Sequence, residues 1–372
     1  MFNTKQWANK VIEPSGVVLD GPNPWDPQIK NEKLYKRVKA EGSLGLGEAY
    51  MDGWWDCEAL DQFFYRVLSL EDIYKRLGLS LPVIADYVKA KVLNLQAIKR
   101  AFEVGEKHYD TGNDLFVPML GKSLAYSCGY WKDADNLDEA QEDKYDLICR
   151  KLNLKPGQKI LDIGCGWGGL ARHAAKNYGV SVVGITVSKE QAKLASELCA
   201  GLPIEFRVMD YRDLKEKFDH VVSVGMFEHV GVKNYHTYMK TVRKCLKPEG
   251  LFLLHTIGSL RSGSNTDPWI AKYIFPNGML PSLKQITNCV EGLFVVEDVH
   301  NFSADYDKTL MAWHANFEKA WPDVKKNYSE KFYRMWRYYL LCCAGTFRSR
   351  SNQLWQIVLS PRGVPGGYQS AR

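Results

Sequence analysis

The sequence has no apolar run approaching the roughly 20 residues that a membrane-spanning helix needs. Its first residues, MFNTKQWANKVIEPSG, contain no apolar core followed by a small-residue cleavage site, so they do not resemble a secretory signal. With 45% hydrophobic and 25% charged residues, the composition is that of a globular protein. We therefore expect a folded protein that stays in the cytoplasm.

Regularly spaced cysteines are also missing. The nine cysteines are an odd number, are scattered along the chain and include no C-x-x-C pair. This spacing fits neither a disulfide framework nor a zinc site. We expect reduced thiols and no bound metal ion.

A large net charge is absent too, since the whole chain carries only +6. Residues 325–372, however, contain nine Lys and Arg against one acidic residue, Glu330. Aromatic residues interleave there with Lys331, Arg334 and Arg337, which suits a surface that meets anionic lipid or nucleic acid. A helix with buried aromatics and a solvated basic face explains the same pattern equally well.

The first hundred residues show helical periodicity near 33–40, 58–69 and 82–104 and no convincing strand alternation. Glycine-rich turns are predicted between these runs, at Gly42, Gly45, Gly47 and Gly53. We predict a helical N-terminal domain over 1–100 that docks on lipid, followed by a catalytic domain over 101–372.

From about residue 155 the pattern becomes apolar strand segments that alternate with helical stretches. This alternation predicts an α/β fold with a mainly parallel, Rossmann-like sheet. Two late segments separated by a helical stretch suit an antiparallel edge. The seven predicted strand segments read KILDIG, SVVGITV, IEFRVMD, HVVSVGM, LFLLHTIG, FVVEDVH and LWQIVLS.

A glycine loop follows the first of these segments. Asp162, Gly164, Gly166 and Gly168 form D-x-G-x-G-x-G between a buried strand and a helix start, where open α/β sheets bind ligands. The spacing differs from the G-x-G-x-x-G of dinucleotide sites, so it favours S-adenosylmethionine and a class I methyltransferase. The second strand ends without the acidic residue that commonly holds the ribose, so Thr186 and Gln191 are the polar groups available there.

After the third strand, Asp210 and Tyr211 are candidates for adenine contacts, although an ordinary polar loop explains them too.

Several longer motifs are similar to one family, the bacterial cyclopropane-fatty-acyl-phospholipid synthases, and to the related mycolic acid cyclopropane synthases. They are SLGLGEAYMDGWWD, HYDTGNDLF, YSCGYW, LDIGCGWGG, GMFEHVG, LHTIG and DPWIAKYIFPNGMLPS. The resemblance covers nearly the whole chain. It implies transfer of a methylene from S-adenosylmethionine to the cis double bond of an unsaturated phospholipid acyl chain.

The resemblance also implies the roles of individual residues. Residues similar to the bicarbonate ligands of the family are Cys128, Glu228, His255, Ile257 and Tyr306. Cys343 resembles a cysteine that has sometimes been given an active-site role, and packing in an apolar helical run is the alternative explanation for it. Residues similar to its cofactor contacts, with the loop taken as 161–169, are Tyr126, Ser127, Leu161, Asp162, Gly164, Cys165, Gly166, Trp167, Gly168, Gly169, Thr186, Gln191, Tyr211 and Arg212.

The chemistry of such a reaction needs a dry pocket and one base. Attack of an alkene on the sulfonium leaves a carbocation, and ring closure requires loss of a proton from the delivered methyl group. A carboxylate could collapse onto the cation as an ester, so bicarbonate is a sensible proton acceptor. Aromatic faces could stabilise the cation, although core packing explains them equally well. The aromatic candidates are Tyr130, Trp131, Phe227, Trp269 and Tyr306.

The lipid substrate implies transient binding to the inner face of the cell membrane rather than insertion. Two segments are candidates, the amphipathic run 83–102 with its basic polar face and the basic aromatic segment from Lys325. The run 83–102 is equally explained as a linker helix packed on the catalytic domain. The family resemblance also implies a homodimer.

Three other functions share parts of this pattern. A nucleic-acid methyltransferase would use the basic segment, but GMFEHVG stands where amino-methylating enzymes commonly carry N/D-P-P-Y/F, so no nucleic-acid partner is expected. A phospholipid headgroup N-methyltransferase shares both the fold and the membrane partner, and the sequence distinguishes it from a cyclopropane synthase only through the YSC, FEH and HTIG positions. A non-catalytic lipid-binding protein would be expected to lose the glycine loop or the pair Glu228 and His255, and both are present.

Overall fold

A seven-stranded sheet forms the centre of the larger part of the molecule, in the order β5-β4-β3-β6-β7-β9-β8. The strands β3 to β7 are parallel, and β9 runs antiparallel to both of its neighbours. All seven predicted segments form strands, which confirms the class I methyltransferase architecture. The strands are β3 (Lys159–Ile163), β4 (Ser181–Thr186), β5 (Ile204–Val208), β6 (His220–Val224), β7 (Phe252–Ser259), β8 (Val295–Asn301) and β9 (Asn352–Ser360).

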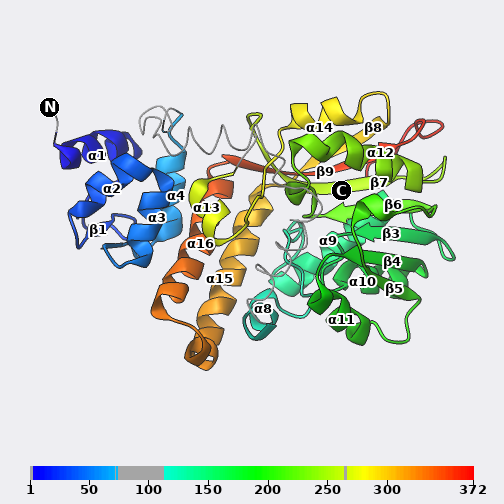
Figure 1. Ribbon diagram of the computed structural model, residues 1–372, viewed down its shortest axis with the longest axis horizontal. Helices are drawn as coiled ribbons and strands as arrows, with labels where there is room; N and C mark the ends of the chain where they lie inside the picture. The colour runs from blue at the N-terminus through cyan, green and yellow to red at the C-terminus, as the bar shows by residue number, and fades with distance from the viewer. Residues whose placement is uncertain (1–2, 72, 74–112, 264–265) are drawn as a thin grey trace.

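Helices pack around this sheet, and two long ones extend from it toward the N-terminal part (Figure 1). Because β3, β6 and β7 are parallel neighbours, their carboxyl ends lie at one edge of the sheet.

The computed structural model describes residues 3–71, 73, 113–263 and 266–372. The helices of this part are α8 (Asn113–Leu120), α9 (Leu137–Lys151), α10 (Gly169–Tyr178), α11 (Lys189–Leu198), α12 (Tyr235–Cys245), α13 (Pro268–Tyr273), α14 (Leu283–Val290), α15 (Ala304–Val324) and α16 (Glu330–Arg348).

The N-terminal part is helical, as predicted, but two details differ from the prediction. The helices are α1 (Thr4–Ile12), α2 (Lys33–Glu41), α3 (Ser43–Met51) and α4 (Leu60–Leu68), and two-residue strands β1 (Gln28–Ile29) and β2 (Trp55–Asp56) pair antiparallel. Gly45 and Gly47 lie inside α3 and not in turns, so that prediction was wrong. A Cβ at Gly47 would stand 2.4 Å from the Trp269 ring, so glycine there permits close packing of α3 on α13.

The basic aromatic segment after Lys325 is not a free surface. Helix α16 packs on α3 and α4, and its aromatics Trp336, Tyr338 and Tyr339 are buried as the helix interpretation predicted. Three of its cations nevertheless contact the N-terminal part, although the Lys331 side chain remains 58% exposed. Lys331 Nζ lies 2.7 Å from Asp52, Arg334 Nη2 lies 2.6 Å from Asp56, and Arg337 Nη2 donates to the Glu58 carbonyl at 2.9 Å.

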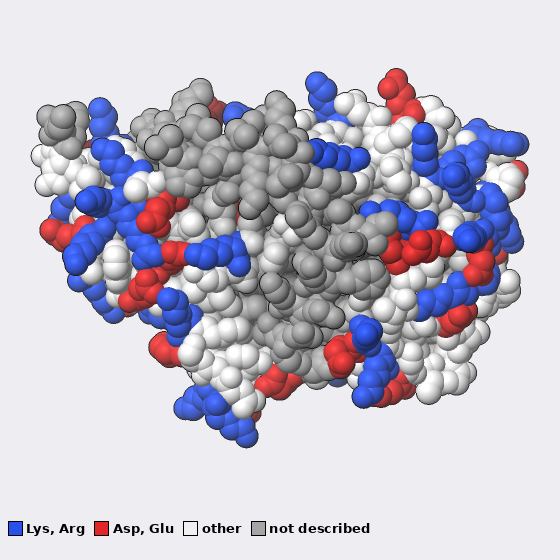
Figure 2. Space-filling model, in the orientation of Figure 1, with Lys and Arg blue, Asp and Glu red and all other residues white. Residues whose placement is uncertain are grey.

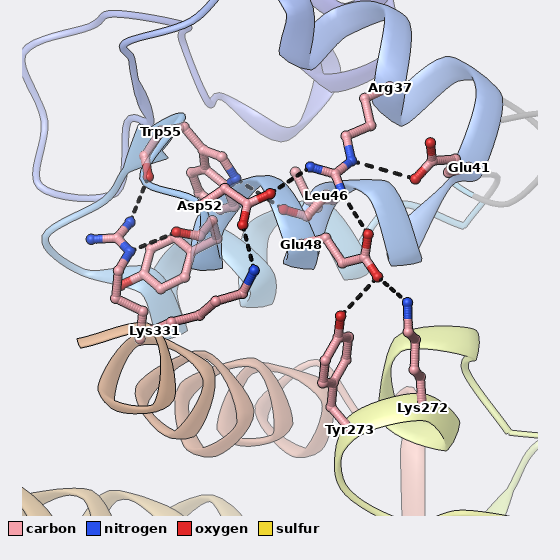
Figure 3. Close-up of polar contacts among 11 residues, drawn as sticks. Arg37, Glu41, Leu46, Glu48, Asp52, Trp55, Lys272, Tyr273 and Lys331 are labelled. Atoms are coloured by element: carbon pink, nitrogen blue, oxygen red, sulfur yellow. Dashed lines mark hydrogen bonds and ion pairs between the residues drawn. The ribbon is translucent and has the colours of Figure 1, made fainter. Parts of the chain in front are cut away.

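A network of charged groups joins the N-terminal part to α13 and α16 (Figure 3). Glu48 of α3 accepts from Lys272 Nζ at 2.5 Å and from the Tyr273 hydroxyl at 2.8 Å, and it also pairs with Arg37 of α2. Arg37 in turn donates to Asp52 at 2.9 Å. The two parts are thus held together by polar contacts as well as by the packing of α16.

The predicted boundary at residue 100 and the amphipathic run 83–102 lie outside the described residues. Within the described ranges, no helix combines the length and the apolar character needed to cross a membrane.

Candidate active site

The glycine loop leaves the sheet at the end of β3 and turns sharply into α10. Gly164, Gly166 and Gly168 all have positive φ, at +85°, +54° and +79°, which L side chains rarely adopt. A Cβ at Gly164 would also stand 2.7 Å from Met226 Cβ. The loop therefore needs glycine both for its turn and for its close approach to the loop after β6.

This loop borders a cavity of about 200 Å³ at the carboxyl ends of β3, β4 and β6, which we call the cofactor cavity. Two predicted contacts, Leu161 and Gly168, are not in its wall. Leu161 is buried in the core, and a Cβ at Gly168 would face Phe206 at 2.6 Å. The predicted residues that do line the cavity are Tyr126, Ser127, Asp162, Gly164, Cys165, Gly166, Trp167, Gly169, Thr186, Gln191, Asp210, Tyr211 and Arg212.

The polar groups of this wall are partly engaged with each other. Thr186 Oγ1 donates to Gln191 Oε1 at 2.8 Å, next to the expected ribose position. Asp210 accepts from Arg212 Nε at 2.7 Å and Nη2 at 2.9 Å, so its carboxylate is already neutralised. Burial raises the pKa of Asp162 to about 7, against the opposing effect of a nearby lysine on α9.

Some wall residues of the cofactor cavity were not predicted. Lys144 and Tyr145 come from α9, His229 follows β6, and Asn277 follows α13. The sequence signal for Lys144 was a lysine on the apolar face of α9, the face that the folded helix buries. His229 ends a three-residue 3-10 helix and Asn277 lies in a loop, and neither is long enough for sequence periodicity to indicate the direction of a side chain.

A second cavity of about 630 Å³, which we call the acyl cavity, extends from the N-terminal helices to the same sheet edge. Apolar side chains of α1, α2 and α4 line it on one side. Glu228, His255 and Tyr306 line it on the other. The two cavities share Tyr126, Ser127, Gly225 and His229 as wall residues, so they are neighbours at this point.

Glu228 and His255 present unsatisfied polar atoms at the acyl cavity. The Ile257 N–H donates to Glu228 Oε1 at 2.7 Å, while Oε2 is buried without a hydrogen-bond partner among the described residues. His255 Nδ1 lies 3.3 Å from Gln356 Nε2, and its Nε2 is likewise buried with no partner in that part of the chain. Burial raises the pKa of Glu228 to about 7, so this carboxyl group can gain or lose a proton near neutral pH, and burial lowers the pKa of His255, so its imidazole is neutral there.

Of the other residues predicted to bind bicarbonate, two line the acyl cavity and one does not. Tyr306 and Ile257 line the acyl cavity with Glu228, and burial holds the pKa of the Tyr306 hydroxyl well above its usual value. Cys128 is fully buried but does not line either cavity. Its Sγ lies 3.8 Å from Thr309 Oγ1 and 3.1 Å from the Gly129 carbonyl.

Comparison with known proteins identifies the family. Residues 96–357 match the family model described as mycolic acid cyclopropane synthetase. The chain is 56% identical over 365 residues to a cyclopropane-fatty-acyl-phospholipid synthase of Escherichia coli (strain K12), covering 98% of this chain and 95% of that protein. The chain belongs to the mycolic acid cyclopropane synthetase family.

Solved structures agree with this membership in the cyclopropane synthetase family. A mycolic acid cyclopropane synthase, solved in complex with SAH and CTAB, is 33% identical, with a TM-score of 0.65 over 69% of this chain and 97% of that one. A coclaurine N-methyltransferase reaches a TM-score of 0.68 over 85% of this chain, but at 22% identity it shows the fold alone.

Two secondary expectations for this cyclopropane synthetase family member change with the structure. Of the five aromatics predicted to face the carbocation, Trp269 and Tyr306 line the acyl cavity. Tyr130, Trp131 and Phe227 do not, and Phe227 stacks on Tyr235 in the core at 4.1 Å. Cys343 lines the acyl cavity, but burial raises the pKa of its thiol to about 12, so it is a protonated wall residue and a poor nucleophile.

Proposed function

We propose that the protein is a cyclopropane-fatty-acyl-phospholipid synthase. It transfers a methylene from S-adenosylmethionine to the cis double bond of an unsaturated phospholipid acyl chain and releases S-adenosylhomocysteine. The observation that carries this proposal is the meeting of the two cavities. A glycine-loop cavity for the cofactor shares a wall with a long apolar cavity whose inner end holds Glu228 and His255.

The proposed reaction has two steps at this wall. The alkene attacks the sulfonium methyl carbon, the S–CH3 bond breaks with its electron pair going to sulfur, and a carbocation forms on the neighbouring acyl carbon. A C–H bond of the delivered methyl group then breaks, its electron pair closes the ring and the proton leaves to a base. The apolar walls exclude water, which would otherwise capture the cation.

The residues at the inner end fit a small bound oxyanion such as bicarbonate. Glu228 Oε2 and His255 Nε2 are buried polar atoms without partners among the described residues, and both residues line the same cavity, where one small ligand could satisfy both atoms. With Gln356 donating to Nδ1, His255 Nε2 carries a proton and can donate, as can Tyr306 and the protonated form of Glu228. When bound, bicarbonate would be the proton acceptor. A side-chain carboxylate in the same place could instead form an ester with the carbocation.

The lipid substrate implies that the protein docks transiently on the inner face of the cell membrane. The apolar lining supplied by the N-terminal part supports a role for that part in lipid capture. A homodimer is proposed on family resemblance, and no nucleic-acid partner is proposed.

The experiment is to incubate the purified protein with S-adenosylmethionine and vesicles of a monounsaturated phospholipid, and then to locate the added carbon in the lipid. A cyclopropane ring in the acyl chain is expected, and vesicles of saturated phospholipid should give no product. Carbon added only to the headgroup would overturn the proposal. Removing dissolved carbonate should slow the reaction, and an unchanged rate would remove bicarbonate from the site.

A further inference from the structure

One buried cation of the cofactor cavity has no part in the chemistry described so far. Lys144 lies on α9 with none of its surface exposed, although it contributes to the wall of the cofactor cavity. Its Nζ donates to Ser127 Oγ at 2.8 Å and to Gln141 Oε1 at 2.6 Å. Removing an ammonium group from water costs several kcal/mol, so its retention at this place calls for a compensating role.

Ser127 is held from two sides by α9. Lys144 donates to its hydroxyl oxygen, and the Gln141 amide donates to its carbonyl oxygen at 2.9 Å. Because the ammonium occupies a lone pair of Oγ, the hydroxyl of Ser127 is turned to donate its own proton elsewhere. Ser127 lines the cofactor cavity, so an acceptor placed in that cavity would receive this proton.

The cofactor cavity therefore has a group of each sign in its wall. Lys144 stands behind Ser127, and Asp162 is a buried carboxyl group whose pKa is raised by burial against the opposing effect of the Lys144 ammonium. The amino-acid end of S-adenosylmethionine carries one ammonium and one carboxylate. An oriented hydroxyl backed by a cation suits the carboxylate, and Asp162 suits the ammonium.

We propose that Lys144 is a positioning residue that holds Ser127 as the hydrogen-bond donor to the α-carboxylate of the cofactor. This inference rests on the proposed function only in taking S-adenosylmethionine as the ligand. It concerns binding, so it can be tested without turnover and without lipid.

The electrostatics of the buried lysine give the role a pH signature. Desolvation lowers the pKa of Lys144 to about 7. A bound carboxylate favours the charged ammonium and raises this pKa again, so the contribution of Lys144 to affinity is full below pH 7 and fades as the pH rises above it. Titration of the α-amino group of the ligand is common to all variants and cancels when variants are compared at each pH.

The test is calorimetric binding of two ligands, S-adenosylmethionine and its decarboxylated analogue, to the wild type and to Lys144→Met. Without Lys144, the Ser127 hydroxyl is no longer held in place to donate to the carboxylate. Losing such a hydrogen bond to a charged group costs about tenfold or more in affinity. We expect Lys144→Met to weaken S-adenosylmethionine binding by about tenfold or more near pH 6 and by less near pH 9. Binding of the decarboxylated analogue should change by no more than about threefold.

The matched control is Lys151→Met, which removes another fully buried lysine of the same helix that contacts His300 and not the cofactor cavity. It should leave the affinity for both ligands within about twofold. Ser127→Ala provides a second variant, and its combination with Lys144→Met should weaken binding no further than the stronger single change. Equal losses for both ligands in Lys144→Met, equal losses in Lys151→Met or additive losses in the double variant would each overturn the inference. Ring formation by the wild type tests the proposed function separately.

Discussion

Among single residues, Glu228 and His255 decide what chemistry the acyl cavity can support, because burial sets the protonation state of each. Their proximity could be predicted from the sequence, because both follow the parallel strands toward the same edge of the sheet. The structure places them less simply, with Glu228 in the short 3-10 helix after β6 and His255 inside β7, opposite the last residue of β6. The sequence does not predict which of their polar atoms stay unsatisfied. That depends on the partners of the other atoms, the Ile257 amide for Glu228 and Gln356 for His255, and each partner comes from a different strand or loop.

A first prediction concerns Glu228→Gln. This change keeps the shape of the side chain but removes the carboxyl group that would hold bicarbonate and exchange a proton with it, so ring formation should fall by about 100-fold or more. The affinity for S-adenosylmethionine, measured by calorimetry, should stay within about threefold, because Glu228 does not line the cofactor cavity. Glu249→Gln, at an exposed glutamate before β7, is the control that should retain full activity. Full turnover by Glu228→Gln would remove the residue from the site.

A second prediction follows from the raised pKa of Glu228, from 4.5 to about 7. The folded protein holds this proton more tightly than the unfolded chain, so the contribution of Glu228 to stability decreases as the pH rises from about 4.5 to about 7. Glutamine cannot ionise, and Glu228→Gln should therefore be more stable than the wild type at pH 8 by on the order of 3 kcal/mol. At pH 4.5 the two should be equal. Denaturant unfolding at both pH values measures this, and an equal difference at each would contradict the burial effect.

At the level of elements, the strands of the sheet were predictable because each is a short segment rich in apolar residues that lies between turns or helical stretches. Helix α3 was not, since its sequence SLGLGEAYM contains two glycines that usually mark turns. Those glycines are explained only by contacts with other elements, the Arg37 carbonyl for Gly45 and the Trp269 ring for Gly47. The cations of α16 were misread for the same reason, because their partners lie more than 250 residues away in sequence.

A third prediction tests the contact between α3 and α13. Glu48 is largely buried and binds groups from two other helices, so Glu48→Gln should lower the free energy of unfolding by about 2 kcal/mol. Activity on lipid should fall more than cofactor affinity, because the N-terminal part lines the acyl cavity. Glu32→Gln, whose carboxylate is exposed and pairs with Lys5, should change stability by less than about 0.5 kcal/mol. Equal effects of the two changes would contradict a structural role for the Glu48 contacts.

Across the whole molecule, the described part of the face in Figure 2 shows basic and acidic side chains interspersed rather than one continuous basic area. Much of the positive segment found in the sequence binds the N-terminal part instead. The net charge of the whole chain, +6, still favours binding to an anionic surface.

A fourth prediction follows from this charge. Binding to vesicles that contain anionic phospholipid should weaken by about tenfold or more as the salt concentration rises from ~0.1 M to ~0.5 M, because screening shortens the range of the attraction. Co-sedimentation with vesicles measures this, with uncharged vesicles as the control. Binding that is equally strong at both salt concentrations would show that apolar contacts alone hold the protein on the membrane.

In the proposed reaction, the acyl chain receives a methyl group, which then loses one of its protons at the site of Glu228 and His255. The most direct measurement uses S-adenosylmethionine with a fully deuterated methyl group and vesicles of monounsaturated phospholipid, followed by mass spectrometry of the released fatty acids. The proposed reaction leaves two of the three deuterium atoms in the acyl chain, within a ring. All three deuterium atoms retained, on the chain or on the headgroup, would contradict it.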